Sequence, residues 1–443
     1  MNDLDLTIEK LIYGGAGLAR LPADERGPGK AAFVPFTLPG ERVRAAVEEE
    51  KPGFVRASVD EILERSGKRL EPQCIYFQRC GGCHYQHAGY EYQLEIKAEI
   101  LKENLRRQAK MDAPFELRLH GSPPWNYRNR TRLQARADSG FALGYFKSSS
   151  HVLLPVETCP ISSPLINRAI AVLWRLGRSG QVPAELREVE LFANDDDTQL
   201  QVELYSDPHQ DKARRTQSAQ ALAERLRAEL AGVVSVYVFA QTIGVGRGVQ
   251  WHITEEPDWT LGPGEFRYRT KAGSLRVSGG SFFQVNRFLV DQIVDIVTGG
   301  RRGEIALDLY AGVGLFSAAL ATSFRHIVAV ESSQGSAGDL KYNAPRNVKA
   351  VRSTVDEYLA GRGAKVRPDL IVVDPPRAGL GERVARGVAS LGASRLTYVS
   401  CDPATLARDL VTLTSAGYRV EQVHLVDLFP QTYHIESVVE LIR

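Results

Sequence analysis

The chain has 443 residues, more than one ordinary hydrophobic core organises, so two or three domains are expected. Its 43% hydrophobic and 24% charged residues are typical of globular proteins, and this composition requires no disordered part. The net charge of +2 does not by itself indicate nucleic-acid binding, so such a surface must come from local clusters. The acidic first five residues and the lack of a long uncharged apolar run predict no secretory signal and no membrane span. We therefore expect a cytoplasmic protein whose cysteines stay reduced.

The first segment, residues 1–62, alternates short apolar stretches with glycine-containing turns such as Gly14-Gly15 and Leu38-Pro39-Gly40. About five short strands with such turns predict a small β-barrel of the OB type. Barrels of this kind commonly bind oligonucleotides, and an accessory barrel without RNA contact is the alternative.

The second segment, residues 63–270, contains four of the five cysteines. Cys74, Cys80 and Cys83 lie within ten residues, Cys159 follows downstream, and the fifth, Cys401, stands alone near the end of the chain. In a reducing compartment the first four cysteines suggest a metal site, and Cys401 suggests a separate role.

The same segment contains a charged helix and an arginine-rich run. Residues 90–110 carry an apolar stripe that includes Leu94 and Leu101, with basic residues such as Lys97 on the other faces, where a solvated surface is the ordinary interpretation. Residues 125–136 interleave aromatic residues with arginines, which suits the stacking of bases and the binding of phosphates. An ordinary charged strand is the alternative. Residues 130–270 otherwise indicate mixed β structure with a helix near 211–230.

The third segment, residues 271–443, has a regular α/β pattern. Helix-length stretches separate four apolar strand candidates, at residues 305–310, 327–331, 370–374 and 396–400. This alternation predicts a doubly wound, mostly parallel sheet. Two closing strands, at 420–428 and 437–442, fit an antiparallel hairpin at the edge of that sheet.

A glycine-containing loop, Asp308 to Ser317, follows the first of these strands and opens a helix. Gly312 and Gly314 let the backbone approach a ligand closely, and Glu331 ends the next strand, where a carboxylate can accept hydrogen bonds from ribose hydroxyls. A dinucleotide fingerprint is the alternative, but its third glycine is missing. A carboxylate at Asp308 would also repel a pyrophosphate, whereas it suits the cationic S-adenosylmethionine.

Two further motifs end strands at the edge where open α/β sheets place their ligands. Enzymes that methylate exocyclic amines close a turn like Asp374-Pro375-Pro376-Arg377 with an aromatic residue, so Arg377 disfavours that chemistry. Cys401 follows the next strand, and the helix start behind it is expected to lower the thiol pKa from about 8.5. A small buried hydrophobe is the alternative interpretation of this cysteine.

A thiolate serves methyl transfer to carbon 5 of uracil, because its addition to carbon 6 makes carbon 5 nucleophilic. A base must then remove the carbon 5 proton so that the cysteine can leave. Glu436 is the candidate base, and His434 is interpreted as a structural or substrate-orienting partner.

Together these motifs, with the stretch 278–286 (Ser-Gly-Gly-Ser-Phe-Phe-Gln-Val-Asn), resemble the bacterial 5-methyluridine RNA methyltransferases over nearly the whole chain, specifically their iron–sulfur-containing 23S ribosomal RNA branch. The resemblance implies a class I, Rossmann-like methyltransferase domain at 271–443, Cys401 as nucleophile and Glu436 as base. It also implies that S-adenosylmethionine and the uracil are bound by Gln284, Tyr310, Gly312, Gly314, Leu315, Glu331, Asp356 and Asp374. The family often has asparagine at the position of Asp402 and a polar residue at that of Leu315.

For the rest of the chain, the resemblance implies an RNA-binding TRAM barrel at 1–62 and a mixed α+β iron–sulfur domain at 63–270, with the helix at 90–110 packing on the catalytic domain. A 4Fe–4S cluster held by Cys74, Cys80, Cys83 and Cys159 fits the spacing better than zinc, which usually takes two CxxC-like pairs. Zinc and the absence of any metal stay the alternatives, and the cluster is expected to be structural.

The predicted function is thus methylation of uridine carbon 5 in RNA, with 23S rRNA favoured and tRNA possible. We expect a monomer, because flipping one base out of its stack needs one copy. Two other classes stay open from sequence: an RNA-binding protein that has kept the fold without catalysis, and an iron–sulfur electron carrier.

Overall fold

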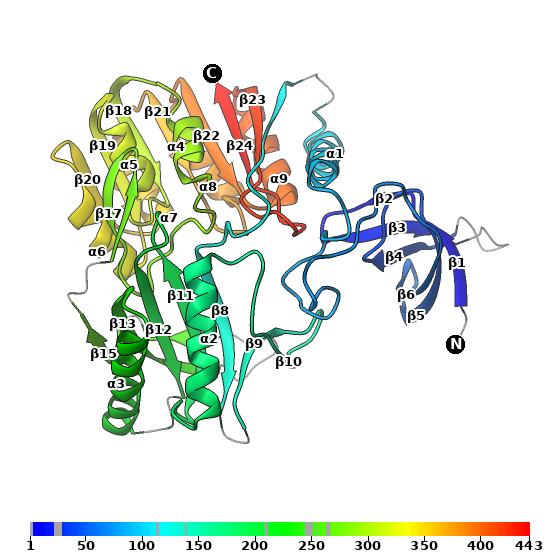
Figure 1. The fold of residues 1–443 in the computed structure, drawn as a ribbon. Coiled ribbons are helices and arrows are strands. Elements are labelled where there is room, and N and C mark those ends of the chain that lie inside the picture. The colour runs from blue at the N-terminus through cyan, green and yellow to red at the C-terminus, as the bar shows by residue number, and fades with distance from the viewer. Residues whose placement is uncertain are drawn as a thin grey trace.

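The computed structural model describes residues 3–21, 29–111, 115–137, 140–207, 209, 211–243, 251–254, 256–262 and 266–443. The chain runs from a strand-rich N-terminal module through a central mixed sheet into an α/β domain (Figure 1). The first two residues of the acidic start lie outside the described ranges. No helix in these ranges is both long and apolar enough to cross a membrane.

The N-terminal module is a six-stranded sheet in the order β1-β5-β6-β4-β3-β2. The alternation of apolar and polar residues turns one face of the strands inward, so that Leu6, Val34 and Val43 share a core of their own. Its strands are β1 (Asp3–Thr7), β2 (Lys10–Leu11), β3 (Ala16–Arg20), β4 (Ala31–Pro35), β5 (Arg42–Glu50) and β6 (Phe54–Glu64).

The central sheet has the order β10-β9-β8-β11-β12-β13-β14, with β15 paired to β13. Its strands are β8 (Arg130–Arg136), β9 (Ala142–Phe146), β10 (Leu153–Pro155), β11 (Leu186–Ala193), β12 (Leu200–Ser206), β13 (Val233–Ile243), β14 (Trp251–Ile253) and β15 (Trp259–Leu261). Helices α2 (Pro164–Arg178) and α3 (Lys212–Glu229) pack on it with a shared apolar core (Figure 1). The expected helix near 211–230 is confirmed, whereas α2 was not predicted.

The α/β domain is an eight-stranded sheet in the order β20-β19-β18-β21-β22-β24-β23-β7. Its first five strands are parallel, which confirms the doubly wound fold. The strands are β18 (Gly303–Leu309), β19 (Phe324–Glu331), β20 (Val348–Arg352), β21 (Leu370–Val373), β22 (Arg395–Ser400), β23 (Arg419–Val426) and β24 (Ser437–Ile442). The helices are α4 (Val290–Thr298), α5 (Leu315–Leu320), α6 (Gln334–Asn343), α7 (Val355–Ala360), α8 (Gly381–Ser390) and α9 (Pro403–Ser415), with a hairpin of β16 (Arg267–Thr270) and β17 (Gly273–Arg276) before them.

Two elements from the middle of the chain join the α/β domain. Strand β7 (Leu117–His120) pairs in parallel with β23, so the predicted placement of the closing hairpin at the sheet edge is wrong, although β23 and β24 are antiparallel as expected. Helix α1 (Tyr90–Ala109) contributes Leu94, Leu101 and Leu105 to the core that it shares with α8 and α9. The prediction that Lys97 lies on a solvated face of this helix is also wrong, because its side chain is 0% exposed.

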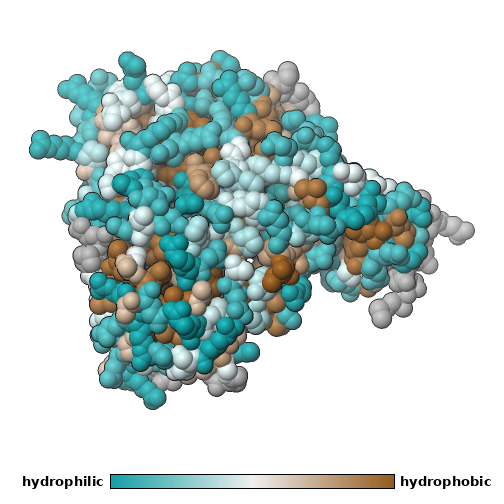
Figure 2. Space-filling view, viewed as in Figure 1, coloured by the Kyte–Doolittle hydropathy of each residue, from teal (hydrophilic) through white to brown (hydrophobic). Residues whose placement is uncertain are grey.

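Hydrophilic residues cover much of the face seen in Figure 2, and hydrophobic side chains gather there in small separate patches, one of them on the N-terminal module. Most apolar side chains therefore serve the separate cores of the module, the central sheet and the α/β domain.

Candidate active site

The registers of the α/β sheet bring the candidate residues together. Leu309 on β18 pairs with Val373 on β21, which pairs with Tyr398 on β22, so the residues after these strands share the carboxyl edge of the sheet. The antiparallel pair Ser400 and Ser437 between β22 and β24 then sets Cys401 beside Glu436. The candidate nucleophile and the candidate base are thus neighbours because of strand register alone.

The carboxyl groups at this edge are buried close to one another, which favours their protonated forms. Burial, and then the charge of Asp374, raises the pKa of Glu436 well above its usual range. Burial and the charge of Asp308 raise the pKa of Asp374 to about 7. The nearby Arg377 guanidinium acts in the opposite direction on Glu436. Burial therefore makes ionisation of Glu436 and Asp374 more costly than that of an exposed carboxyl group.

The Cys401 thiol has a raised pKa, which overturns the expectation that the following helix lowers it. Burial, followed by the charges of Glu436 and Asp374, raises its pKa to about 12. The first backbone N–H groups of α9 are already engaged, because the Asp402 side chain accepts hydrogen bonds from Ala404 N and Thr405 N.

The glycine loop after β18 has the backbone that a closely approaching ligand requires. Gly312 and Gly314 have φ values of 55° and 95°, in the left-handed region that glycine adopts at little cost, and Tyr310 has 65°. Both carboxylate oxygens of Glu331 accept backbone hydrogen bonds, from Gly312 N at 2.9 Å and Ser333 N at 2.7 Å. Glu331 therefore holds the loop in place.

Beneath this loop, the Asp308 carboxyl group is fully buried. Its Oδ2 accepts a hydrogen bond from the Ser317 hydroxyl, and its Oδ1 has no hydrogen-bond partner among the described residues. Burial raises the pKa of Asp308 to about 6.

Three other predicted ligand residues lie in different surroundings. Gln284 is 8% exposed, and its side-chain amide makes no hydrogen bond within the described ranges. Leu315 packs into the apolar core under the loop. Asp356, in the first turn of α7, forms an ion pair with Arg383 on α8.

The segment that leads to Glu436, residues 427–436 and hereafter the Glu436 loop, is lined with aromatic rings. The Tyr433 ring lies 4.4 Å from the His434 ring and 4.5 Å from the His84 ring, centroid to centroid. Burial lowers the pKa of His434 to about 3, so this histidine is neutral and fits the structural role expected for it.

Sequence reasoning missed Tyr13, which brings the N-terminal module to the site. Its hydroxyl donates a hydrogen bond of 3.3 Å to the Cys401 carbonyl oxygen, and its ring meets Tyr433 edge-on at 5.6 Å. The only signal in the sequence is that an aromatic residue stands just before the Gly14-Gly15 turn. Residues at turns often take part in binding, so this position could have been considered.

The four clustered cysteines line one cavity of about 220 Å³, together with Arg128 and Tyr145 among others. The thiols of Cys74, Cys80 and Cys83 each have a pKa raised by burial and further by the charges of other cysteines in the group. Within the described ranges, however, no three His, Cys, Asp or Glu side chains converge closely enough to hold a metal ion. The structure thus brings the four residues to one cavity without forming a site for a single ion.

The arginine-rich run at 125–136 is mostly committed to contacts within the protein. Arg130 pairs with Glu190 and Glu203, and Arg132 pairs with Glu190 and Glu188. Tyr127 is 0% exposed. The expectation that this run stacks bases and holds phosphates therefore loses its basis at these positions, where the ordinary strand is the better interpretation.

Comparison with known proteins agrees with this architecture. Residues 89–443 match the family described as tRNA (uracil-5-)-methyltransferase, and residues 3–59 match the TRAM domain. A 23S rRNA (uracil(1939)-C(5))-methyltransferase RlmD from Halomonas elongata is 33% identical over 99% of this chain and 89% of the relative. An uncharacterized RNA methyltransferase from Aquifex aeolicus is 32% identical over 98% of this chain and 97% of the relative.

Among solved structures, Pyrococcus abyssi tRNA (uracil-54, C5)-methyltransferase in complex with S-adenosyl-L-homocysteine shares the fold, with a TM-score of 0.73 at 22% identity over 99% of this chain and 100% of that chain. The parallel sheet, the glycine loop after β18 and the polar strand ends of β21 and β22 belong to an α/β methyltransferase fold. The chain belongs to the tRNA (uracil-5-)-methyltransferase family and carries a TRAM domain at its N-terminal side. It is an S-adenosylmethionine-dependent RNA uracil-C5-methyltransferase, as the sequence motifs predicted.

Proposed function

We propose that this enzyme methylates carbon 5 of a uridine in 23S ribosomal RNA in the cytoplasm, with Cys401 as nucleophile and Glu436 as base. The observation that carries the proposal is the register of β22 and β24, which sets these two residues side by side at the ligand edge of the sheet. Asp374 is near enough for its charge to raise the pKa of both groups.

The reaction requires a thiolate and a base in sequence. The Cys401 sulfur adds to carbon 6 of the uracil, and the ring electrons that this addition releases make carbon 5 nucleophilic. S-adenosylmethionine supplies the methyl group that carbon 5 takes up. Glu436 then removes the carbon 5 proton, the C–H electron pair restores the C5–C6 double bond, and the C6–S electron pair returns to Cys401. A carboxylate whose pKa is raised is a stronger base once it is ionised, which suits this step.

Several features support a place for the methyl donor between the glycine loop and β21. Asp308 Oδ1 and the Gln284 amide have no hydrogen-bond partner in the described part of the chain, and both are able to hydrogen-bond a ligand. The buried carboxyl groups of Asp308 and Asp374 favour a cation over a pyrophosphate. Tyr310, Gly312, Gly314 and Glu331 would line the same loop, whereas Leu315 and Asp356 would act through packing and through the ion pair with Arg383.

We also propose that Cys74, Cys80, Cys83 and Cys159 hold a 4Fe–4S cluster. A tetrahedral zinc ion needs four sulfurs at about 2.3 Å from one point, whereas these thiols surround a cavity of about 220 Å³. A cubane brings its own sulfides and fills a larger space than one ion does. When bound, the cluster would cross-link the segment around Cys80 to the segment around Cys159. Anaerobic purification followed by iron and sulfide analysis tests this, with bound zinc as the refuting result.

The identity of the RNA substrate is the most specific part of the proposal. Relatives from Halomonas elongata and Chromohalobacter salexigens, each 33% identical over 99% of this chain, are named as 23S rRNA methyltransferases, which favours ribosomal RNA. The family description favours tRNA as the second candidate. Mass spectrometry of nucleosides from a strain that lacks the gene, with ribosomal and transfer RNA separated, distinguishes them. Loss of 5-methyluridine from the 23S fraction is expected, and loss only from tRNA would refute this choice of substrate.

Two variants test the residue roles with the RNA so identified. Cys401→Ala is expected to abolish methyl transfer, because no adduct at carbon 6 can form. Glu436→Gln is expected to accumulate a covalent enzyme–RNA adduct on denaturing gels, because the carbon 5 proton is not removed. Full turnover by Cys401→Ala would refute the nucleophile assignment.

A further inference from the structure

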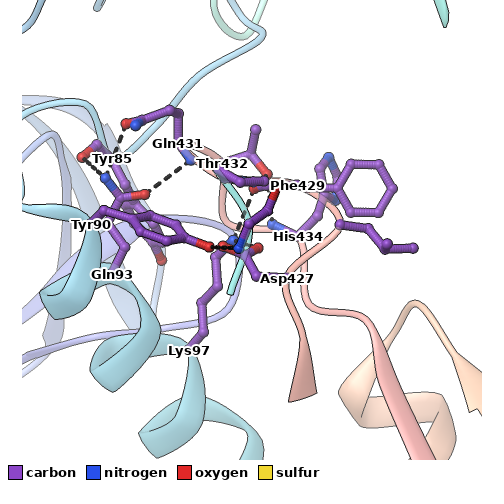
Figure 3. Close-up of polar contacts among 12 residues, drawn as sticks. Tyr85, Tyr90, Gln93, Lys97, Asp427, Phe429, Gln431, Thr432 and His434 are labelled. Atoms are coloured by element: carbon purple, nitrogen blue, oxygen red, sulfur yellow. Dashed lines mark hydrogen bonds and ion pairs between the residues drawn. The ribbon is translucent and has the colours of Figure 1, made fainter. Parts of the chain in front are cut away.

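The Glu436 loop is anchored from outside its own sheet by a buried glutamine on α1. Gln93 is 0% exposed, its Oε1 accepts a hydrogen bond from Gln431 N at 2.9 Å, and its Nε2 donates to Gln431 Oε1 at 3.0 Å (Figure 3). The same Nε2 also lies within hydrogen-bond distance of the carbonyl oxygens of Tyr85 and Ala88. Gln93 therefore joins α1, the loop and the cysteine-bearing segment at one point.

Other contacts fix the first half of the loop. Lys97, one turn along α1, donates to Asp427 Oδ1 at 2.7 Å and to the Phe429 carbonyl oxygen at 2.9 Å (Figure 3). The backbone N–H groups of His84 and Tyr85, which directly follow Cys83, donate to the Gln431 carbonyl oxygen at 2.8 and 3.0 Å. Every one of these anchors lies outside the strands that carry the loop.

By contrast, the second half of the loop has few polar anchors of its own. His434 N donates to the Thr432 hydroxyl at 3.2 Å, and the Glu436 carbonyl oxygen accepts a hydrogen bond from Val426 N at 2.9 Å. The Glu436 carboxyl group makes no hydrogen bond within the described ranges. The position of the Glu436 carboxyl group thus depends on how firmly residues 427–431 are held and on the pairing of β24 with β22.

We propose that α1 and residues 84–85 form a clamp on the Glu436 loop, and that Gln93 is a positioning residue for the base. The proposal rests on the proposed function, because it takes Glu436 as the group that removes the carbon 5 proton. Gln93 lies more than 300 residues before that loop in the chain and carries out no chemistry itself. Its amide sets where the loop runs, and the loop sets where the carboxylate points.

The clamp acts on one step of the reaction. Once Cys401 has lost its thiol proton, its addition to carbon 6 and the uptake of the methyl group at carbon 5 do not require Glu436 to accept the carbon 5 proton, because no proton leaves carbon 5 in either step. Only afterwards does Glu436 take the carbon 5 proton, while the C5–C6 double bond re-forms and the C6–S bond breaks. A loosened loop therefore slows the release of the methylated RNA, whereas a generally destabilised protein loses every step in parallel.

The test uses the full-length enzyme with ribosomal RNA from a strain that lacks the gene. In a single turnover with radioactive S-adenosylmethionine, Gln93→Leu is expected to transfer the methyl group within about twofold of the parent rate and to release the methylated RNA about tenfold more slowly. The covalent adduct then accumulates on denaturing gels, as expected for Glu436→Gln.

Gln422→Leu is the matched control. Gln422 is also a buried glutamine, 8% exposed, and its Nε2 donates to the backbone carbonyl of Glu116, away from the Glu436 loop. This variant is expected to lower the rates of methyl transfer and of RNA release by the same factor, or to change neither rate. Gln431→Met removes the same side-chain contact from the loop side and replaces Gln93→Leu if that variant does not fold.

The outcomes separate the two proposals. If Glu436→Gln accumulates adduct while Gln93→Leu and Gln431→Met do not, the clamp is refuted and the base assignment stands. If Glu436→Gln itself accumulates no adduct, the assignment of the base fails and the clamp fails with it. If Gln93→Leu slows methyl transfer and RNA release by the same factor, as partial unfolding of the protein would, the positioning role is also refuted.

Discussion

The ion pair between Lys97 and Asp427 predicts that Lys97→Met destabilises the α/β domain strongly. Both side chains are 0% exposed, and the ammonium nitrogen lies 2.7 Å from the carboxylate oxygen. Methionine keeps the length of the side chain but leaves the Asp427 carboxylate buried without its cation. Breaking a buried pair from one side in this way costs about 3–5 kcal/mol.

The size of the effect follows from the size of the folding unit. Helix α1, strand β7 and the sheet of the α/β domain share one core and are expected to unfold together. For a unit of roughly 200 residues, each kcal/mol shifts the melting temperature by about 2–4 °C, so the variant is expected to melt roughly 6–20 °C lower.

Calorimetry of the full-length protein, supported by urea unfolding, measures the shift. The double variant Lys97→Met/Asp427→Leu removes both charges together and is expected to recover most of the loss, because well-packed apolar groups can replace a buried pair. Arg386→Met is the surface control, since its partner Glu382 on α8 is about as exposed as Arg386 itself, at 70% and 72%, and such a pair contributes below about 0.5 kcal/mol. A Lys97→Met shift no larger than that of Arg386→Met would refute the reasoning.

Three further predictions concern the site. RNA that contains 5-fluorouridine traps the covalent adduct. The rate of trapping should rise up to about tenfold per pH unit between pH 7 and 9, because the Cys401 thiol, with a pKa raised to about 12, is mostly protonated there. A rate that does not change with pH would contradict this prediction. Since the folded-state pKa of Asp308 is raised from 3.8 to about 6, its contribution to stability is lost as pH rises through that range. In chemical denaturation without ligand, the stability of Asp308→Asn relative to the parent should therefore be about 2 kcal/mol greater at pH 8 than at pH 4, and an unchanged difference would mean an ordinary carboxyl group. Cys83→Ser should lose iron and visible absorption while Cys401→Ser keeps both, and equal iron in the two variants would argue against the proposed ligands.

Strands β18, β19, β21 and β22 could be predicted from sequence because each is a short apolar run that ends at a polar motif, whereas β20 (Val348–Arg352) was not predicted. The rule that ligands bind at the carboxyl ends of parallel strands is enough to place Asp374 and Cys401 on one edge of the sheet. The pairing of Cys401 with Glu436 needs one more fact, the antiparallel order of β22 and β24, which the closing hairpin pattern indicates only in part.

Contacts between segments far apart in the chain could not be predicted in this way. Lys97 has the surroundings of a surface residue in sequence, and only the approach of Asp427, 330 residues later, makes its burial tolerable. Strand β7 is four residues long and carries no pattern that assigns it to the last sheet. The thiol pKa of Cys401 was predicted in the wrong direction because burial and the neighbouring carboxyl groups both raise it. Burial is not visible in the sequence, the carboxyl groups come from other strands, and the helix terminus is already capped by Asp402.

Arg377 partly offsets the electrostatic cost of ionising the buried groups of the site. The site gathers a thiol and several carboxyl groups whose pKa values are all raised, so that forming the thiolate and ionising the base are both costly there. The Arg377 guanidinium lowers the pKa of Cys401 and of Glu436, and it opposes the cost of both ionisations. An aromatic residue at this turn, which stacks on a base in amine-methylating enzymes, would offer no such charge. The proposed mechanism needs the Cys401 thiolate first and the Glu436 carboxylate afterwards, and the two groups lie close together. A cation at the end of β21 stabilises both anions.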